Sequence, residues 1–223
     1  MPRNNRTGLR SKSGVADATA TPQANSRQRA TPSPGGRGEV RIIGGQWRGR
    51  KLHFPQSAAL RPTPDRVRET LFNWLQFELA GKRCLDLFAG SGALGFEALS
   101  RGAAAVQFIE PEPAAARAIG EALRTLGTDR GNVEQQDAFA YLRGKPVVPY
   151  DIVFIDPPYA ERWLGRSCTA LEQGGWLKPG AWVYLEDGAA YGAPDLPAGW
   201  NLLRSKKAGD VGYHLARLHQ AHE

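Results

Sequence analysis

The stretch Tyr150-Asp-Ile-Val-Phe-Ile-Asp-Pro-Pro-Tyr159 joins a run of large apolar residues to an abrupt polar end. Residues 152–155 are all large, apolar and of high β propensity, which indicates a strand buried on both faces of a parallel sheet. Ligands bind beyond the carboxyl ends of such strands. The stretch therefore predicts an α/β fold with a ligand site at Asp156.

The chemistry of this strand end suits an amine. The prolines after Asp156 lack N–H groups, so a carboxylate and free carbonyls face one small space. A nitrogen that donates two hydrogens, such as the exocyclic amine of a base, would satisfy these acceptors, and Tyr159 offers a flat face for stacking. We predict Asp156, Pro157 and Tyr159 as catalytic residues. The alternative is a strand that ends in an ordinary Pro-rich loop.

Strand and helix patterns alternate along most of the chain. Strands are expected near 84–88, 105–109, 133–135, 152–155 and 181–185, with helices near 64–79, 93–100, 113–126, 138–142 and 162–173. Residues 200–204 and 211–217 suggest an antiparallel hairpin around Gly209-Asp210. This order predicts a Rossmann-like α/β fold, with a seven-stranded, mostly parallel sheet, helices on both faces and a C-terminal antiparallel hairpin.

Composition sets limits on the class of protein. The 223 residues are 41% hydrophobic and 23% charged, which is typical of a soluble globular chain with one sizeable core. No apolar run approaches the roughly 18 residues needed to cross a membrane. Cys84, Cys168 and the four histidines show no ligand spacing, so we expect reduced thiols in a cytoplasmic protein without a metal site.

The net charge of +7 is unevenly distributed. Residues 1–38 carry +6, residues 39–68 carry +5 and the remaining 155 residues carry −4. We expect 1–38 to be a disordered basic tail because it is almost without large aliphatic residues, although its Arg-rich composition also resembles a transit peptide. Residues 39–63 are expected to form a basic β-hairpin and linker, and 64–223 the catalytic domain.

The expected hairpin turns at Gly44-Gly-Gln-Trp-Arg-Gly-Arg-Lys51. We call Arg48, Arg50 and Lys51 the basic turn, and its charge suits contact with the phosphates of a polyanion. Trp47 either stacks on an exposed base or lies against the body of the protein. Further phosphate contacts are predicted at Arg61, Arg66 and Arg68, near a helix that Thr63 caps and Pro64 begins, although these cations could equally be solvated.

A glycine loop predicts a nucleotide-type cofactor. Gly90-x-Gly92-x-x-Gly95 follows a strand, opens a helix and is followed by an acid, Glu110, which is placed to bind ribose hydroxyls. This fingerprint also occurs in NAD and FAD sites. S-adenosyl-L-methionine is favoured because of Asp86, Asp137 and the acceptor-rich Asp156 motif, although either of the first two acids could instead be a capping or loop acid. The predicted cofactor-binding residues are Asp86, Phe88, Gly90, Gly92, Glu110, Asp137 and Ala138.

Four segments together resemble a known family. They are 41–52, 61–75, the loop Leu85-Asp-Leu-Phe-Ala-Gly-Ser-Gly-Ala-Leu-Gly95, and Asp156-Pro-Pro-Tyr159. They are similar to the bacterial 16S ribosomal RNA guanine-N2 methyltransferases of the small subunit, and the first two segments are the more specific. Tyr159 stands where family members often have Phe. The resemblance covers residues 40–217 and implies a class I methyltransferase fold.

The resemblance also implies a substrate and partner. The substrate would be the 2-amino group of one guanine in the 16S rRNA of the assembling 30S subunit, and we expect the enzyme to act as a monomer. A DNA adenine-N6 methyltransferase is an alternative, but the chain lacks a separate target-recognition domain. A non-catalytic ribosome-assembly factor is a second alternative, against which the intact Asp86, Glu110 and Asp156 argue.

Overall fold

A computed structural model describes residues 37–55, 63–158 and 161–219 of the chain. These residues all lie within one compact unit, Pro32–Glu223. Arg61 and Tyr159 fall outside the described residues, as do residues 1–36 of the predicted basic tail. No helix in the described part is long and apolar enough to span a membrane.

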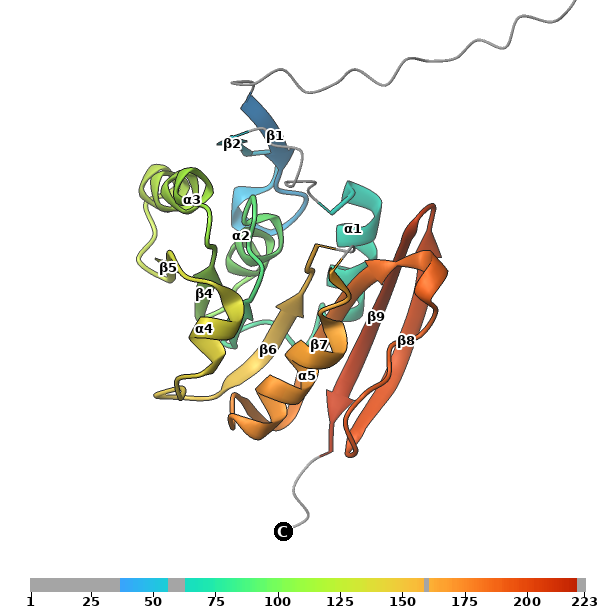
Figure 1. Cartoon of the computed structure of the whole chain (residues 1–223). Coiled ribbons are helices and arrows are strands. Elements are labelled where there is room, and N and C mark those ends of the chain that lie inside the picture. Colours follow the sequence, from blue (N-terminus) through green and yellow to red (C-terminus); the bar gives the residue numbers. More distant parts are fainter. Residues whose placement is uncertain (1–36, 56–62, 159–160, 220–223) are drawn as a thin grey trace, which may run out of the picture. The chain divides into compact units, whose positions relative to one another are not determined.

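The main sheet has seven strands in the order β5-β4-β3-β6-β7-β9-β8. The strands are β3 (Arg83–Asp86), β4 (Ala105–Ile109), β5 (Gly131–Glu134), β6 (Tyr150–Ile155), β7 (Leu177–Gly188), β8 (Trp200–Ala208) and β9 (Val211–Leu218). The first five are parallel to one another, whereas β9 runs antiparallel to both β7 and β8. This arrangement confirms the predicted mostly parallel sheet with a C-terminal hairpin (Figure 1).

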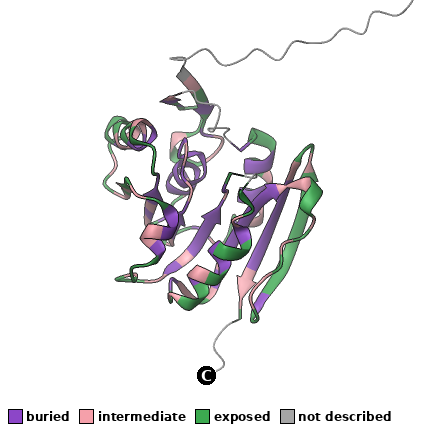
Figure 2. Cartoon of the chain, viewed as in Figure 1, coloured by how far each residue is buried: buried purple, intermediate pink, exposed green. Residues whose placement is uncertain are grey.

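Helices cover both faces of the sheet. One apolar cluster joins α1 (Asp65–Trp74), α2 (Ala93–Ser100) and α3 (Pro113–Leu126) to the sheet, and a second joins α4 (Ala138–Leu142) and α5 (Leu164–Gln173) to the opposite face. Successive strand residues alternate between these clusters: Ile152 and Phe154 belong to the first, Val153 and Ile155 to the second. The central strands are therefore buried on both faces (Figure 2), as the apolar run of β6 predicts.

The N-terminal hairpin packs into the first cluster. Strands β1 (Arg37–Arg41) and β2 (Lys51–Pro55) pair antiparallel around a short 3-10 turn, Gly45–Trp47. Val40, Ile42, Leu52 and Phe54 point inward and are at most 5% exposed. The basic turn is therefore carried on a buried apolar base.

Helix α1 is shorter than predicted. It ends at Trp74 where the pattern predicted a helix as far as 79, although Leu75 and Leu79 remain buried in the turns that follow. Pro64 occupies the N-cap position, and no side chain caps the helix. The predicted cap residue, Thr63, uses its hydroxyl elsewhere.

Candidate active site

Acidic side chains gather at the carboxyl edge of the sheet. Asp86 ends β3, Glu110 follows β4 and Asp156 follows β6. Glu186 and Asp187 lie near the end of β7, directly after Leu185, which pairs with the last residue of β6, and both are buried. These two acids were not among the residues predicted from the sequence, although their position directly after a buried apolar run was the signal that could have found them.

Asp156 lies at the centre of this acidic edge. Burial raises the pKa of Asp156 well above its ordinary value, and the negative charges of Glu186, Asp86 and Asp187 raise it further. A hydrogen bond of 2.9 Å from the Thr63 hydroxyl to Oδ2 lowers this pKa. The site therefore has a strongly negative potential, which attracts a cation or an amine that donates hydrogens.

The glycine loop links β3 to helix α2. Gly90 and Gly92 adopt positive φ angles of 53° and 75°, and Gly92 is the N-cap of α2. A Cβ on Gly92 would lie 2.7 Å from the Phe96 ring, and one on Gly95 would lie 2.1 Å from the Phe108 ring. The loop thus needs glycine both for its backbone conformation and for close packing of the helix on the sheet.

Glu110 is held against this loop by the backbone. Its Oε2 accepts a hydrogen bond from Gly90 N at 2.7 Å, and its Oε1 accepts one from Glu112 N at 2.8 Å. Burial raises the pKa of Glu110, while these two hydrogen bonds lower it. Each oxygen keeps a free acceptor direction, so the predicted contact with ribose hydroxyls is compatible with this geometry and stays a prediction.

Asp86 was predicted to bind the cofactor, but its side chain is almost fully buried. It is 2% exposed, and its Oδ2 accepts a hydrogen bond of 2.9 Å from Gly95 N in the first turn of α2. Burial raises the pKa of Asp86 to about 7, the Gly95 hydrogen bond lowers it and the charge of Glu110 raises it. Asp86 therefore anchors the glycine loop and titrates near neutral pH.

The last predicted cofactor residues lie around α4. Asp137 is exposed and caps α4 by accepting a hydrogen bond of 2.8 Å from Ala140 N, and Ala138 is buried beside it. Phe88 stacks on Trp163, with ring centroids 5.9 Å apart, and Phe139 meets both rings edge-on. This aromatic group was not predicted from the sequence, because Trp163 comes from the far side of the Asp156 loop.

The predicted RNA contacts separate into two kinds. Arg48, Arg50 and Arg66 are exposed, and Lys51 is exposed with an ion pair of 3.0 Å to Glu39. Trp47 does not project from the basic turn: it packs against the first apolar cluster, with the Arg130 guanidinium 5.6 Å from its ring centroid. The structure therefore favours the interpretation in which Trp47 lies against the body.

Arg68 requires a correction. Its side chain is 1% exposed and donates to Asp65 Oδ1 at 2.6 Å, to the Arg41 carbonyl at 2.9 Å and to the Thr63 carbonyl at 3.3 Å. It also lies 3.7 Å from the buried Glu97 carboxylate. Arg68 joins α1 to β1 and α2 inside the protein, so in this structure it is not available to a phosphate.

The family model of Conserved hypothetical protein 95 matches residues 40–217. The chain belongs to this family. Ribosomal RNA small subunit methyltransferase D of Escherichia coli K12 is 48% identical over 184 residues, which cover 82% of this chain and 92% of the relative. The protein of the same name from Haemophilus influenzae is 43% identical over 187 residues, covering 82% and 96% of the two chains.

A solved structure agrees with the fold. The structure of yhhF from Escherichia coli aligns with a TM-score of 0.77 and 46% sequence identity, covering 82% of this chain and 99% of that one. The predicted class I methyltransferase fold is therefore confirmed. Among the described residues, no group of three or more potential ligand side chains could hold a metal ion.

Proposed function

We infer that this protein is an S-adenosyl-L-methionine-dependent methyltransferase that methylates the exocyclic N2 of one guanine in the 16S rRNA of the small ribosomal subunit. The family and its named relatives support this activity, of the guanine-966 type. The observation in the structure that carries it is the position of Asp156, an acid followed by two prolines at the carboxyl end of β6 and surrounded by other acids.

The described residues fit the methyl donor. The Gly90 to Gly92 turn and the N-terminus of α2 leave the backbone close to the sheet edge, and Glu110 is fixed beside them. Phe88 and Phe139 line the same region with apolar surface. When bound, S-adenosyl-L-methionine supplies an electrophilic methyl group on a sulfonium centre.

Asp156 and the Pro157 carbonyl are proposed to accept the two N2 hydrogens of the guanine. These bonds orient the amine and draw the nitrogen towards tetrahedral geometry, so that its lone pair becomes available. Positive charge develops on N2 as the N–methyl bond forms and the S–methyl bond breaks, and the potential of Asp156, Glu186 and Asp187 stabilises it. S-adenosyl-L-homocysteine would leave as the thioether, and N2 would then lose one proton to the Asp156 carboxylate or to water. The proposed stacking partner, Tyr159, lies outside the described residues.

The positions of the two cysteines argue against a covalent mechanism with a cysteine nucleophile. Cys84 is buried inside β3 and Cys168 inside α5, and burial raises the pKa of both thiols. Neither is placed to attack a base as a thiolate, so direct transfer is the mechanism that these residues support. A cytoplasmic, monomeric enzyme acting during 30S assembly fits this proposal.

Isotopically labelled cofactor tests the proposal. The protein is incubated with undermethylated 30S subunits, free 16S rRNA or DNA, and the modified base is mapped. We expect N2-methylguanine at a single 16S position, and we expect Asp156→Ala to bind cofactor but lose at least ~10²-fold in rate. Methyladenine in DNA would establish the first alternative, and binding to 30S without transfer would establish the non-catalytic assembly factor.

A further inference from the structure

Strand β8 is an exposed edge that carries only positive charge. It ends the sheet order and pairs with β9 alone among the described strands. Residues 201–207 are all exposed, and Figure 2 shows β8 as an exposed ribbon beside the buried β9. Its charged side chains are Arg204, Lys206 and Lys207, and the strand contains no acid. Residues 69–223 have a net charge of −4, but three of their cations are therefore grouped on one exposed strand.

The register of the sheet relates these cations to the proposed catalytic centre. Ile155 of β6 lies opposite Leu185 of β7, which lies opposite His214 of β9, which lies opposite Ser205 of β8. One residue further along, Glu186 pairs with Tyr213 and Tyr213 with Lys206. Asp156, the residue after Ile155, thus belongs to the same transverse row as Lys206. Three strand spacings of about 4.8 Å separate the two backbones by about 15 Å.

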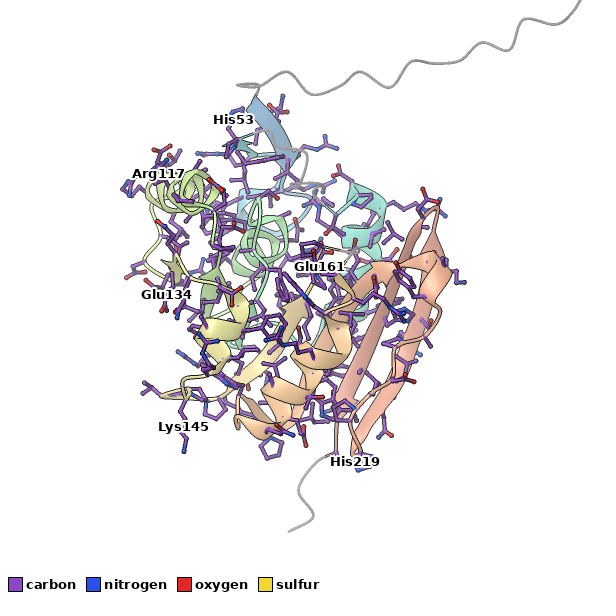
Figure 3. The ribbon with its side chains drawn as sticks, viewed as in Figure 1. His53, Arg117, Glu134, Lys145, Glu161 and His219 are labelled. Carbon is purple, nitrogen blue, oxygen red and sulfur yellow. The ribbon has the colours of Figure 1, made fainter. Side chains whose placement is uncertain are left out.

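The direction of the hairpin brings its tip to the catalytic edge. β8 is parallel to β6, so the β8–β9 turn lies at the edge that holds Asp156. His219, after the end of β9, lies at the opposite edge of the sheet (Figure 3). The Lys206 ammonium lies 5.9 Å from the Trp74 ring centroid, and Trp74 in turn stacks on Tyr213 at 5.5 Å. These contacts hold the stem of Lys206 on the α1 face.

We propose that Arg204, Lys206 and Lys207 form a second RNA-contact surface, the β8 surface, which binds phosphates flanking the target guanine. This proposal rests on the proposed function. The basic turn belongs to a separate two-stranded sheet that packs on α2 and α3, whereas β8 is an edge strand of the seven-stranded sheet (Figure 1). A span of about 15 Å corresponds to about four stacked nucleotides at about 3.4 Å each.

Electrostatics give the reason for cations on both flanks. The acids around Asp156 favour the amine and the developing positive charge, but they repel the phosphates of the same RNA strand. A single basic turn on one flank would bind only one side of the splayed guanine. The β8 surface would offset this repulsion on the other side.

A different explanation exists for charges on an edge strand. Lysines on edges prevent pairing with the strands of other molecules, and the exposed Leu202 and Leu203 give this edge a need for such protection. Protection depends on charge but not on its sign. Reversing the sign therefore separates RNA binding from edge protection.

The test is the double substitution Lys206→Glu with Lys207→Glu. Its matched control is Arg143→Glu with Lys145→Glu, in the loop before β6 at the opposite edge, where Lys145 is labelled in Figure 3. Both variants lower the net charge by the same amount. Binding to undermethylated 30S subunits is measured over a range of salt concentrations, and methylation kinetics are measured separately.

We expect the β8 variant to bind 30S at least ~10-fold more weakly than wild type, with a shallower salt dependence and a higher KM but a similar kcat at saturation. The control should change affinity less than ~2-fold. Equal effects in the two variants, or unchanged affinity in the β8 variant, would overturn the proposal. Lys206→Gln with Lys207→Gln repeats the test if the Glu variant does not fold. Absence of guanine methylation by wild type would overturn the proposed function instead.

Discussion

The Thr63 hydroxyl donates a 2.9 Å hydrogen bond to Oδ2 of Asp156, across 93 positions of sequence. This bond joins the start of α1 to the end of β6, and Thr63 is 4% exposed. This bond lowers the pKa of Asp156, whereas burial and three neighbouring acids raise it. Thr63 therefore helps to keep Asp156 in the ionised form that can accept hydrogens from an amine.

We predict that Thr63→Val moves the acid limb of the kcat/KM profile to higher pH. Without the hydrogen bond the pKa of Asp156 rises, so a higher pH is needed to ionise it. A hydrogen bond to a charged group contributes about 1.5–3 kcal/mol, which is large enough for the movement of the acid limb to be measured. Thr63→Ser keeps the hydroxyl and should keep the wild-type profile. A uniform loss of rate without a shift would assign Thr63 a purely structural role.

Asp156→Asn is expected to stabilise the protein while it abolishes transfer. Because the pKa of Asp156 is raised in the folded state, the folded state binds more protons than the unfolded state above pH ~4. The free energy of unfolding therefore falls as pH rises from there towards the raised pKa. Asparagine removes this loss of stability, so we expect the variant to have a higher Tm than wild type at pH 7. At pH 4 the difference in Tm between the two proteins should be smaller or absent.

The matched control for this stability measurement is Asp195→Asn. Asp195 is also an aspartate but is exposed in the loop before β8. We expect its Tm to follow the wild type within experimental error across the same pH range. An Asp156→Asn variant that is less stable than wild type at neutral pH would contradict the raised pKa.

The raised pKa of Asp86 predicts that the protein releases protons when the cofactor binds. Its pKa is raised to about 7, so part of the free enzyme carries a proton there at neutral pH. The cationic charges of S-adenosyl-L-methionine favour the carboxylate and lower this pKa. Calorimetry at pH 7 in buffers of different ionisation enthalpy should show fractional proton release, and Asp86→Asn should reduce it. Release that is unchanged in Asp86→Asn but lost in Asp137→Asn would assign the proton to a different acid.

Local patterns were enough to predict most of the scaffold. The bounds of β4, α3 and α4 agree with the predicted residues 105–109, 113–126 and 138–142. Each of these elements has a clear period and a clear start, such as Pro113 at the beginning of α3. The end of α1 was harder to predict, because buried residues continue beyond Trp74 in a chain that is no longer helical.

Long-range contacts account for what the sequence did not reveal. Thr63 has the residue type and the position expected of a helix cap. Its hydroxyl instead bonds to Asp156, which only the folded chain brings close to it. Arg68 reads as a surface cation because helix α1 is amphipathic and carries two arginines in its first turns. Its burial depends on Glu97, an acid on a different helix, and on the carbonyl of Arg41. No spacing rule connects these residues.

We predict that Arg48→Glu with Arg50→Glu weakens RNA binding and leaves cofactor affinity unchanged. Both side chains are exposed on the basic turn, whereas Lys51 is already paired with Glu39. Fewer phosphate contacts should also flatten the dependence of affinity on salt. The measurement is 30S affinity between low and moderate salt, with cofactor affinity measured on the same samples. RNA affinity and salt slope equal to those of wild type would mean that the basic turn is only a solvated surface.

Glu97 holds the base of the basic turn from inside the protein. It is 0% exposed, and its carboxylate accepts hydrogen bonds of 2.8 Å from both Ile43 N and Gly44 N. Arg101 Nε donates to it at 2.7 Å, and Arg68 lies 3.7 Å away. The helix that begins at the glycine loop thus also anchors the turn proposed to bind RNA.

Glu97→Ala should therefore destabilise the protein and loosen this turn. It removes the acceptor of two backbone N–H groups and of Arg101 Nε, together with the buried ion-pair partner of Arg68, a loss of about 3–5 kcal/mol. Urea unfolding measures the cost, and Glu69→Ala, at an exposed position on α1, should change stability by no more than ~0.5 kcal/mol. Hydrogen exchange at the amides of Ile43 and Gly44 should quicken in a Glu97→Gln variant that stays folded. Unchanged exchange at both amides would show that the turn keeps its conformation without the carboxylate.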